Sequence, residues 1–143
     1  MKKLLLLTSL LMMTNCFAGE LKDYLQVKTA VTQGQSIRIA TDFSKCTSDT
    51  NSKSLQKYLL GVFSPNSIVI DNAGKIKSSL KHFSLNDPNV PGKPVYQYVA
   101  YVLNQDNSIK ISVNVLDAVS YAPIKATSVV NCTIADGVSI YTH

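Results

Sequence analysis

The stretch VYQYVAYVLNQDNSIKISVNV, residues 95–115, decides the fold of this chain. Its second half alternates strictly, as a half-buried strand does. The apolar positions of that half are Ile109, Ile111, Val113 and Val115. Its first half, residues 95–103, is apolar or aromatic at both parities, so it predicts a strand covered on both sides or one with an aromatic binding surface on one side. The short polar turn at 104–107 predicts that the two strands are antiparallel neighbours.

Alternation of period two recurs on both sides of this pair. It is present in residues 36–43, 60–70, 76–85, 129–134 and 138–141. Pro65 interrupts the second of these segments, which predicts a bulge there or a place at a sheet edge. In 76–85 the apolar residues change parity near Lys81 and His82, which predicts a bulge at that point.

A helix is expected only near the N-terminus. Residues 20–33 carry apolar side chains near helical spacing and end before Gly34, which predicts a short amphipathic helix. Residues 47–57 are polar and predict a loop. The fold class is therefore mainly β: one short N-terminal helix and about seven strands in an antiparallel curled sheet, closed as a barrel or folded as a sandwich.

Residues 1–18 have the pattern of a secretory signal peptide. Lys2 and Lys3 precede an apolar run, and Ala18 follows Cys16 at the spacing of a small-residue cleavage site. Lipid modification of Cys16 is the alternative, which the residues before it fit poorly. We expect residues 19–143 to form a single β-rich domain that is exported and is periplasmic or secreted, with no transmembrane segment.

Charge and cysteine content narrow the possible functions. The net charge is +5, and cleavage of the signal peptide would remove the two positive charges of Lys2 and Lys3. The remaining lysines are scattered along the chain, a distribution that does not predict a nucleic-acid partner. Cys46 and Cys132 then remain as a pair, and in an oxidising compartment an isolated pair predicts a disulfide. The alternatives, a metal site or a redox motif, lack the histidines or the Cys-x-x-Cys spacing that they need.

Several segments together resemble one family. They are residues 38–46 (RIATDFSKC), His82-Phe83, residues 92–95 (GKPV), Asn131-Cys132 and residues 136–138 (DGV). In order and spacing they are similar to the VirK family of small exported bacterial proteins, over about residues 20–141. The resemblance implies export, a link to virulence and a disulfide, and it brings no established catalytic activity. The chain departs from the family at Leu60-Gly61-Val62, where a Gly-Gly step is expected.

Four residues are candidates for a binding site. Tyr96, Tyr98 and Tyr101, with Tyr121 further on, could line a pocket or an interface, although core packing is the simpler interpretation. His82 could be a general base only with an acidic or nucleophilic partner, for which Asp42 and Asp71 are the candidates. A structural histidine is the preferred interpretation.

Lysines at one parity provide a further candidate surface. Lys75, Lys77 and Lys81 could form a basic stripe for an anionic partner, or simply a solvated face. Asp42, at a strand end, is expected to have a structural role. No phosphate loop, metal-ligand cluster or nucleophile elbow is visible in the sequence, so we expect neither enzyme activity nor a cofactor.

Two functions from different classes follow. The first is a non-enzymatic binding module for a protein or an envelope component, with the tyrosines or the lysine stripe as its surface. The second is a carrier that holds a small apolar molecule inside a β-barrel. A hydrolase centred on His82 ranks well below both.

Overall fold

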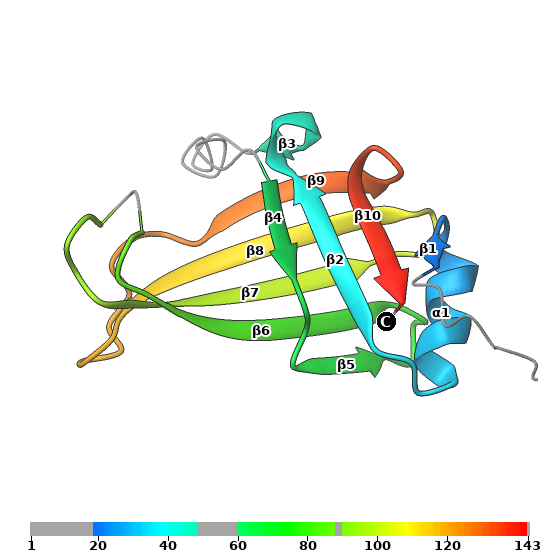
Figure 1. Ribbon diagram of the computed structural model, residues 1–143, viewed down its shortest axis with the longest axis horizontal. Helices are drawn as coiled ribbons and strands as arrows, with labels where there is room; N and C mark the ends of the chain where they lie inside the picture. Colours follow the sequence, from blue (N-terminus) through cyan, green and yellow to red (C-terminus); the bar gives the residue numbers. More distant parts are fainter. Residues whose placement is uncertain (1–18, 49–59, 88–89, 143) are drawn as a thin grey trace, which may run out of the picture.

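The computed structural model describes residues 19–48, 60–87 and 90–142. In these ranges the chain forms one α-helix, one 3-10 helix and ten strands (Figure 1). The elements in chain order are β1 (Glu20–Leu21), α1 (Tyr24–Thr32), β2 (Ile37–Asp42), η1 (Phe43–Lys45), β3 (Thr47–Ser48), β4 (Leu60–Phe63), β5 (Ser67–Ile70), β6 (Ile76–Ser84), β7 (Val95–Leu103), β8 (Ser108–Asp117), β9 (Ser128–Ile134) and β10 (Gly137–Thr142).

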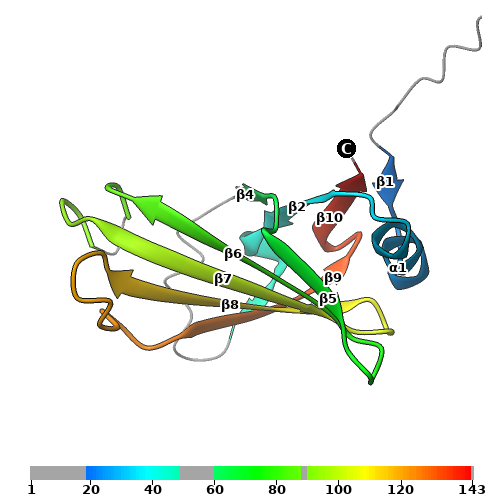
Figure 2. The ribbon, with the colours of Figure 1, turned by 90° about the horizontal axis from the view of Figure 1, so that it is seen from below.

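All the strands belong to one sheet with the order β4-β2-β10-β9-β8-β7-β6-β5, with β1 added to β10 and β3 to β9. The end strands β4 and β5 are joined by residues 64–66 alone, so the sheet must curl until its two ends lie near each other. Figures 1 and 2 show the result: β2, β4 and β10 cross over one face of the long strands β6, β7 and β8. The predicted mainly β fold with one short helix is confirmed, in the form of a curled half-barrel.

The core lies between the crossing strands and the long strands. We call the covered face of β6–β8 the inner face and the opposite one the outer face. On β7 and β8 the inner side chains are Val95, Val99, Tyr101, Leu103, Ile109, Ile111, Val113 and Val115, all buried. Ile39 and Ile140 from the crossing strands complete the core. The other parity of β7 points outward, so the strand that is apolar on both sides has one face in the core and one at the surface.

Helix α1 begins after Asp23, whose side chain accepts a hydrogen bond of 2.8 Å from the amide of Gln26. It buries Tyr24, Val27 and Ala30 against one end of the half-barrel (Figure 2). The predicted helix over 20–33 forms from Tyr24 onward. Its first residues, Glu20 and Leu21, instead pair with β10 as β1. Among the described residues, no helix has the length and apolarity to cross a membrane.

The segment 60–70 is two strands rather than the one interrupted strand that was predicted. Pro65 lies between β4 and β5, which occupy opposite ends of the sheet order, so the expectation of an edge position holds for both. Leu60 and Val62 are exposed, and Phe63 of the other parity packs against the core. The break allows the two halves to have different registers, which a single alternation pattern cannot show.

The bulge predicted near Lys81 and His82 is absent. β6 pairs residue for residue with β7, from Ile76 opposite Leu103 to Ser84 opposite Val95. Phe83 keeps the outward parity and is 48% exposed. Its apolar side chain packs against Tyr96 on the outer face. An apolar residue at this outward position therefore requires no bulge in the backbone.

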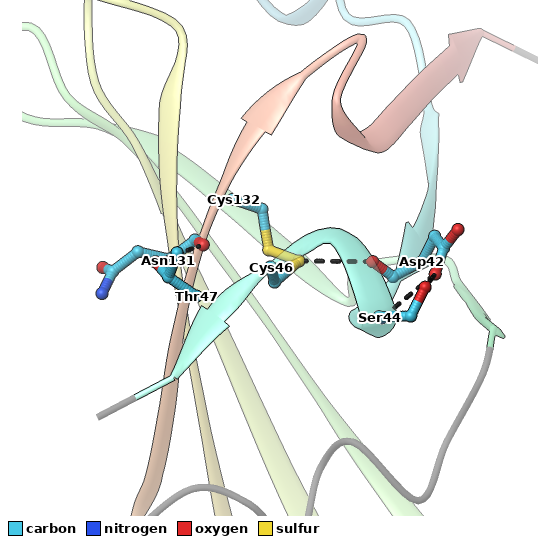
Figure 3. Close-up of a disulfide and its surroundings, with 6 residues drawn as sticks. All are labelled: Asp42, Ser44, Cys46, Thr47, Asn131 and Cys132. Carbon is cyan, nitrogen blue, oxygen red and sulfur yellow. Dashed lines mark hydrogen bonds between the residues drawn. A yellow bond between two sulfur atoms is a disulfide. The ribbon is translucent and has the colours of Figure 1, made fainter. Parts of the chain in front are cut away.

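The predicted disulfide joins Cys46 to Cys132, with the two Cα atoms 4.6 Å apart (Figure 3). Cys46 lies between η1 and β3, and Cys132 lies in β9, with which β3 pairs. The bond therefore does not join the two ends of the sheet order, which are β4 and β5. Beside it, β9 and β10 pair in parallel despite the short connection between them, which is an exception to the expected antiparallel neighbours.

Candidate functional site

An aromatic cluster covers the outer face where β6 ends and β7 begins. Phe83 and Tyr96 are cross-strand partners, and their rings pack edge to face with centroids 5.6 Å apart. The ring of Tyr121 stacks on Tyr96 at 5.6 Å and 10°, and the Lys81 ammonium lies 4.8 Å from the Tyr96 centroid. Tyr98, the cross-strand partner of Lys81, is 37% exposed beside them.

Tyr121 reaches this cluster from a backbone conformation that bulky residues avoid. Its φ is 57°, in the left-handed region, which costs of order 1–3 kcal/mol for such a side chain. The turn before it is fixed by Asp117, whose carboxylate accepts hydrogen bonds from the amides of Val119 and Ser120. These hydrogen bonds hold the pKa of Asp117 below its usual value. The ring of Tyr121 nevertheless remains 53% exposed.

Lysines lie on the same outer face as the aromatic cluster. Lys77 and Lys81 point outward from β6, and the pairing of β6, β7 and β8 places Lys110 in line with Lys77. Lys77 forms an ion pair of 2.9 Å with Asp71 in the preceding turn, which keeps the pKa of Asp71 low. Lys75 lies in that turn, outside β6. The described outer-face positions of β6, β7 and β8 include no carboxylate.

We call this combined surface the outer-face patch. It consists of Lys77, Lys81, Phe83, Tyr96, Tyr98, Lys110, Asn114 and Tyr121. A hollow of about 270 Å³ lies in it beside Tyr98, lined in part by Ser79, Lys81 and Asn114. A surface that combines exposed aromatic rings with lysine side chains is chemically suited to contact an anionic partner.

A second hollow lies on the inner face, where the crossing strands end. This inner pocket has a volume of about 260 Å³. Its apolar walls include Phe43, Phe63, Val99, Val113 and Val115, and its polar groups include His82, Asp87, Gln97 and Lys125. The Asp87 side chain is 1% exposed and accepts a hydrogen bond of 2.7 Å from the Gln97 amide.

His82 lies at this pocket, away from both acidic residues considered as its partners. Its cross-strand neighbour is Gln97, and its side chain is exposed. No hydrogen bond or ion pair joins it to Asp42 or Asp71. Nor do the described residues include a group of three or more potential metal-ligand side chains. The two acidic residues considered as partners of His82 therefore do not contact it in this structure.

Asp42 has the structural role that was predicted. Its carboxylate accepts hydrogen bonds from the amide and hydroxyl of Ser44, at 3.0 and 2.5 Å, and so caps the 3-10 helix that leads to Cys46 (Figure 3). The hydroxyl contact is the main reason that the pKa of Asp42 is lowered.

The structure separates the predicted tyrosines. Tyr96 and Tyr98 belong to the outer-face patch, whereas Tyr101 is 2% exposed in the core, 6.3 Å from Phe63 between ring centroids. Burial raises the pKa of the Tyr101 phenol. Neither Tyr96 nor Tyr98 lines the inner pocket.

Sequence reasoning missed several residues of both sites. Phe83 and Lys110 join the outer-face patch only through the strand pairing, and Asp87 and Gln97 meet at the inner pocket across a loop. A parity argument restricted to β7 could have separated Tyr101 from Tyr96 and Tyr98, since odd and even positions of one strand face opposite ways.

Comparison with known proteins shows which family the chain is similar to. A family model described as VirK protein matches residues 20–121. An uncharacterised protein of Sinorhizobium fredii is 26% identical over 121 residues, which is 85% of this chain and 81% of that protein. The crystal structure of a VirK family protein from Legionella pneumophila is similar with a TM-score of 0.75 and 25% identity, covering 86% of this chain and 98% of that one.

Proposed function

This chain belongs to the VirK family, as its sequence motifs indicated, and on that premise we propose that it is an exported, virulence-associated protein that works by binding a partner protein. It is not an enzyme in this proposal. Export is supported by the pattern of residues 1–18 and is compatible with the disulfide, which needs an oxidising compartment to form and persist.

The outer-face patch is the observation that carries the binding function. Aromatic residues are enriched at protein interfaces, and complementary charge increases the rate and specificity of association. Here Phe83 and Tyr121 are each about half exposed, and the Lys81 ammonium lies over the Tyr96 ring that both of them contact. A surface needed only for solubility would not require the strained backbone of Tyr121.

The test is native mass spectrometry of the protein purified from its own periplasm or culture medium. The intact mass should show cleavage after Ala18 and the oxidised cysteine pair, and a protein partner should co-purify. Replacing Lys81 with Glu and Tyr98 with Ala should remove the partner. The matched change Lys28→Glu, on the exposed side of α1, should retain it. Equal retention by both variants would contradict the proposal.

The carrier function is the second candidate, and the apolar walls of the inner pocket favour it. Its volume of about 260 Å³ is near the lower end of the usual range for small-molecule sites, about 300–1,000 Å³. If the protein is a carrier, the same spectra should contain a bound small molecule. Val113→Phe, which fills the pocket, should then displace that molecule.

A further inference from the structure

One edge of β6 is open over its second half. β5 pairs with Ile76–Ser79 only. Asn66 ends this pairing: its amide donates to the Ser79 carbonyl at 2.8 Å, and its side chain accepts a hydrogen bond from the Lys81 amide at 3.2 Å. Among the described residues no strand continues along β6 beyond this point, as the lower margin of the sheet in Figure 1 shows.

The backbone of this open edge has groups available for pairing. Residues of a strand direct their backbone hydrogen-bonding groups alternately to the two sides. Because Ser79 and Lys81 direct theirs toward the β5 side, Phe83 does so as well. The Lys81 carbonyl and the Phe83 amide and carbonyl thus point away from β7, toward the open edge of the sheet. Within the described residues none of these three groups has a hydrogen-bond partner.

Such edges are normally protected by prolines, bulges, charged side chains such as lysine, or a covering helix or loop. From Lys81 to Ser84 there is no proline and no bulge, and Lys81 is the one charged residue. Three consecutive residues, Lys81, His82 and Phe83, are exposed. Among the described residues, Lys81 is therefore the only such protection, so a strand whose side chains complement a lysine could add here.

The inner pocket and the outer-face patch lie on opposite sides of this same edge. His82 and Ser84 line the inner pocket, whereas Lys81 and Phe83 belong to the outer-face patch. A strand added here would direct alternate side chains to these two surfaces. Its inward residues would meet apolar walls such as Phe63 and Val99, and its outward residues would lie beside Lys81.

Charge favours a partner protein over a second copy of this chain. Pairing β6 with β6 of another copy would bring together two outer faces that carry lysines, and like charges in cross-strand positions are destabilising. An incoming strand with acidic outward residues would instead place a carboxylate beside Lys81. β5, which occupies the first half of the same edge, is antiparallel to β6, and an added strand in line with it would be antiparallel too.

We propose that an extended segment of the partner protein adds to β6 at Lys81–Ser84 as an antiparallel strand, with apolar side chains in the inner pocket and acidic side chains on the outer face. This inference rests on the proposed binding function and specifies how the partner is held. Main-chain hydrogen bonds supply the affinity in this type of recognition, and the alternate side chains supply the specificity.

The test uses an eight-residue peptide that alternates valine and glutamate, blocked at both ends, with 15N-labelled protein in its processed, oxidised form. Amide signals of Lys81–Ser84 should shift on titration to about 1 mM peptide, and exchange of the Phe83 amide with solvent should slow by about tenfold. A peptide alternating valine and lysine should bind at least about tenfold more weakly because of Lys81.

Backbone methylation distinguishes strand addition from contact through side chains alone. In an antiparallel strand, the outward glutamates direct their amides to β6 and the inward valines direct theirs away. N-methylation of the glutamates should therefore abolish binding, and N-methylation of the valines should largely retain it. On the protein, Lys81→Glu should weaken binding by about tenfold, whereas Lys28→Glu, on the exposed side of α1 and away from β6, should change it by less than about threefold.

The proposal is overturned if Lys81–Ser84 do not shift at about 1 mM peptide, if both methylated peptides bind equally, or if the protein pairs with itself through β6. Failure of the binding function itself has a different signature. A co-purified protein that covers the outer-face patch but leaves exchange at Phe83 unchanged would refute strand addition alone. Absence of any co-purified protein would refute the binding function.

Discussion

The ring of Tyr121 lies parallel to the ring of Tyr96, with 5.6 Å between centroids and 10° between planes, although the Tyr121 backbone has a φ of 57°. An offset stack contributes about 0.5–1.5 kcal/mol, while the backbone strain costs of order 1–3 kcal/mol. The arrangement therefore brings the fold little stability. Its effect is to hold an aromatic ring at the surface of the outer-face patch.

Replacing Tyr121 with asparagine tests this interpretation. Asparagine tolerates the left-handed region, so the relief of strain should offset the lost stack, and the free energy of unfolding should change by less than about 1 kcal/mol. Retention of the partner protein should fall. Urea unfolding and co-purification measure the two effects. A loss of stability above about 3 kcal/mol would instead make Tyr121 a structural residue.

The disulfide should account for a large part of the stability of the domain. It closes a loop of 86 residue steps, and removing a native disulfide from a small exported domain typically costs about 2–5 kcal/mol. The variant with Cys46→Ala and Cys132→Ala should lose that amount in urea unfolding. Wild-type protein that is reduced and then reoxidised should recover its strand content by circular dichroism, and failure to recover would contradict this expectation.

Gly137 should be intolerant of a side chain because of the disulfide. Its φ is 94°, and a Cβ there would lie 3.2 Å from the Cys46 Sγ and 3.5 Å from the Cys132 Cβ. Gly137→Ala should therefore destabilise by about 2–3 kcal/mol, of which roughly 1 kcal/mol is backbone strain. Gly34→Ala is the control, because Gly34 has a φ of 75° and open space around it, so only the strain remains. Equal losses would show that contact with the disulfide is unimportant.

Acid should destabilise the protein through Asp71. The Lys77 ammonium lowers its pKa in the folded state, so the folded state binds this proton less readily than the unfolded state. The stabilisation is present above the unfolded pKa of about 3.9 and is lost as the pH falls through the lower folded pKa. Melting temperatures should hold from neutral pH to about pH 5 and drop below about pH 4. Asp71→Asn should make that drop smaller; an unchanged profile would exclude this contribution.

His82 should be dispensable for folding. The side chain is exposed, and no described hydrogen bond or ion pair involves it, so His82→Ala should change the free energy of unfolding by less than about 0.5 kcal/mol. Gln97→Ala, which removes a hydrogen bond to the buried Asp87, should cost about 1–3 kcal/mol. An activity lost in His82→Ala with the stability intact would revive the catalytic hypothesis.

Local patterns in the sequence determined several features of this protein. Strict alternation located β8 and β2, because the side chains of a strand that borders the core must alternate between core and surface. An isolated pair of cysteines beside a signal pattern predicted the disulfide. The family was visible in short ordered motifs. Each of these features depends on residues that are near one another in the chain or on residue type alone.

Strand pairing, which only the tertiary structure shows, decided the rest. The apparent change of parity at Phe83 predicted a bulge because an apolar side chain was assumed to face the core, whereas Tyr96 on the neighbouring strand packs against it on the outer face. Pro65 separates two strands that pair at opposite ends of the sheet. The open edge beside Lys81 exists because β5 stops at Ser79. Alternation depends on the local chain, but strand order and strand ends depend on contacts distant in sequence, so no local pattern encodes them.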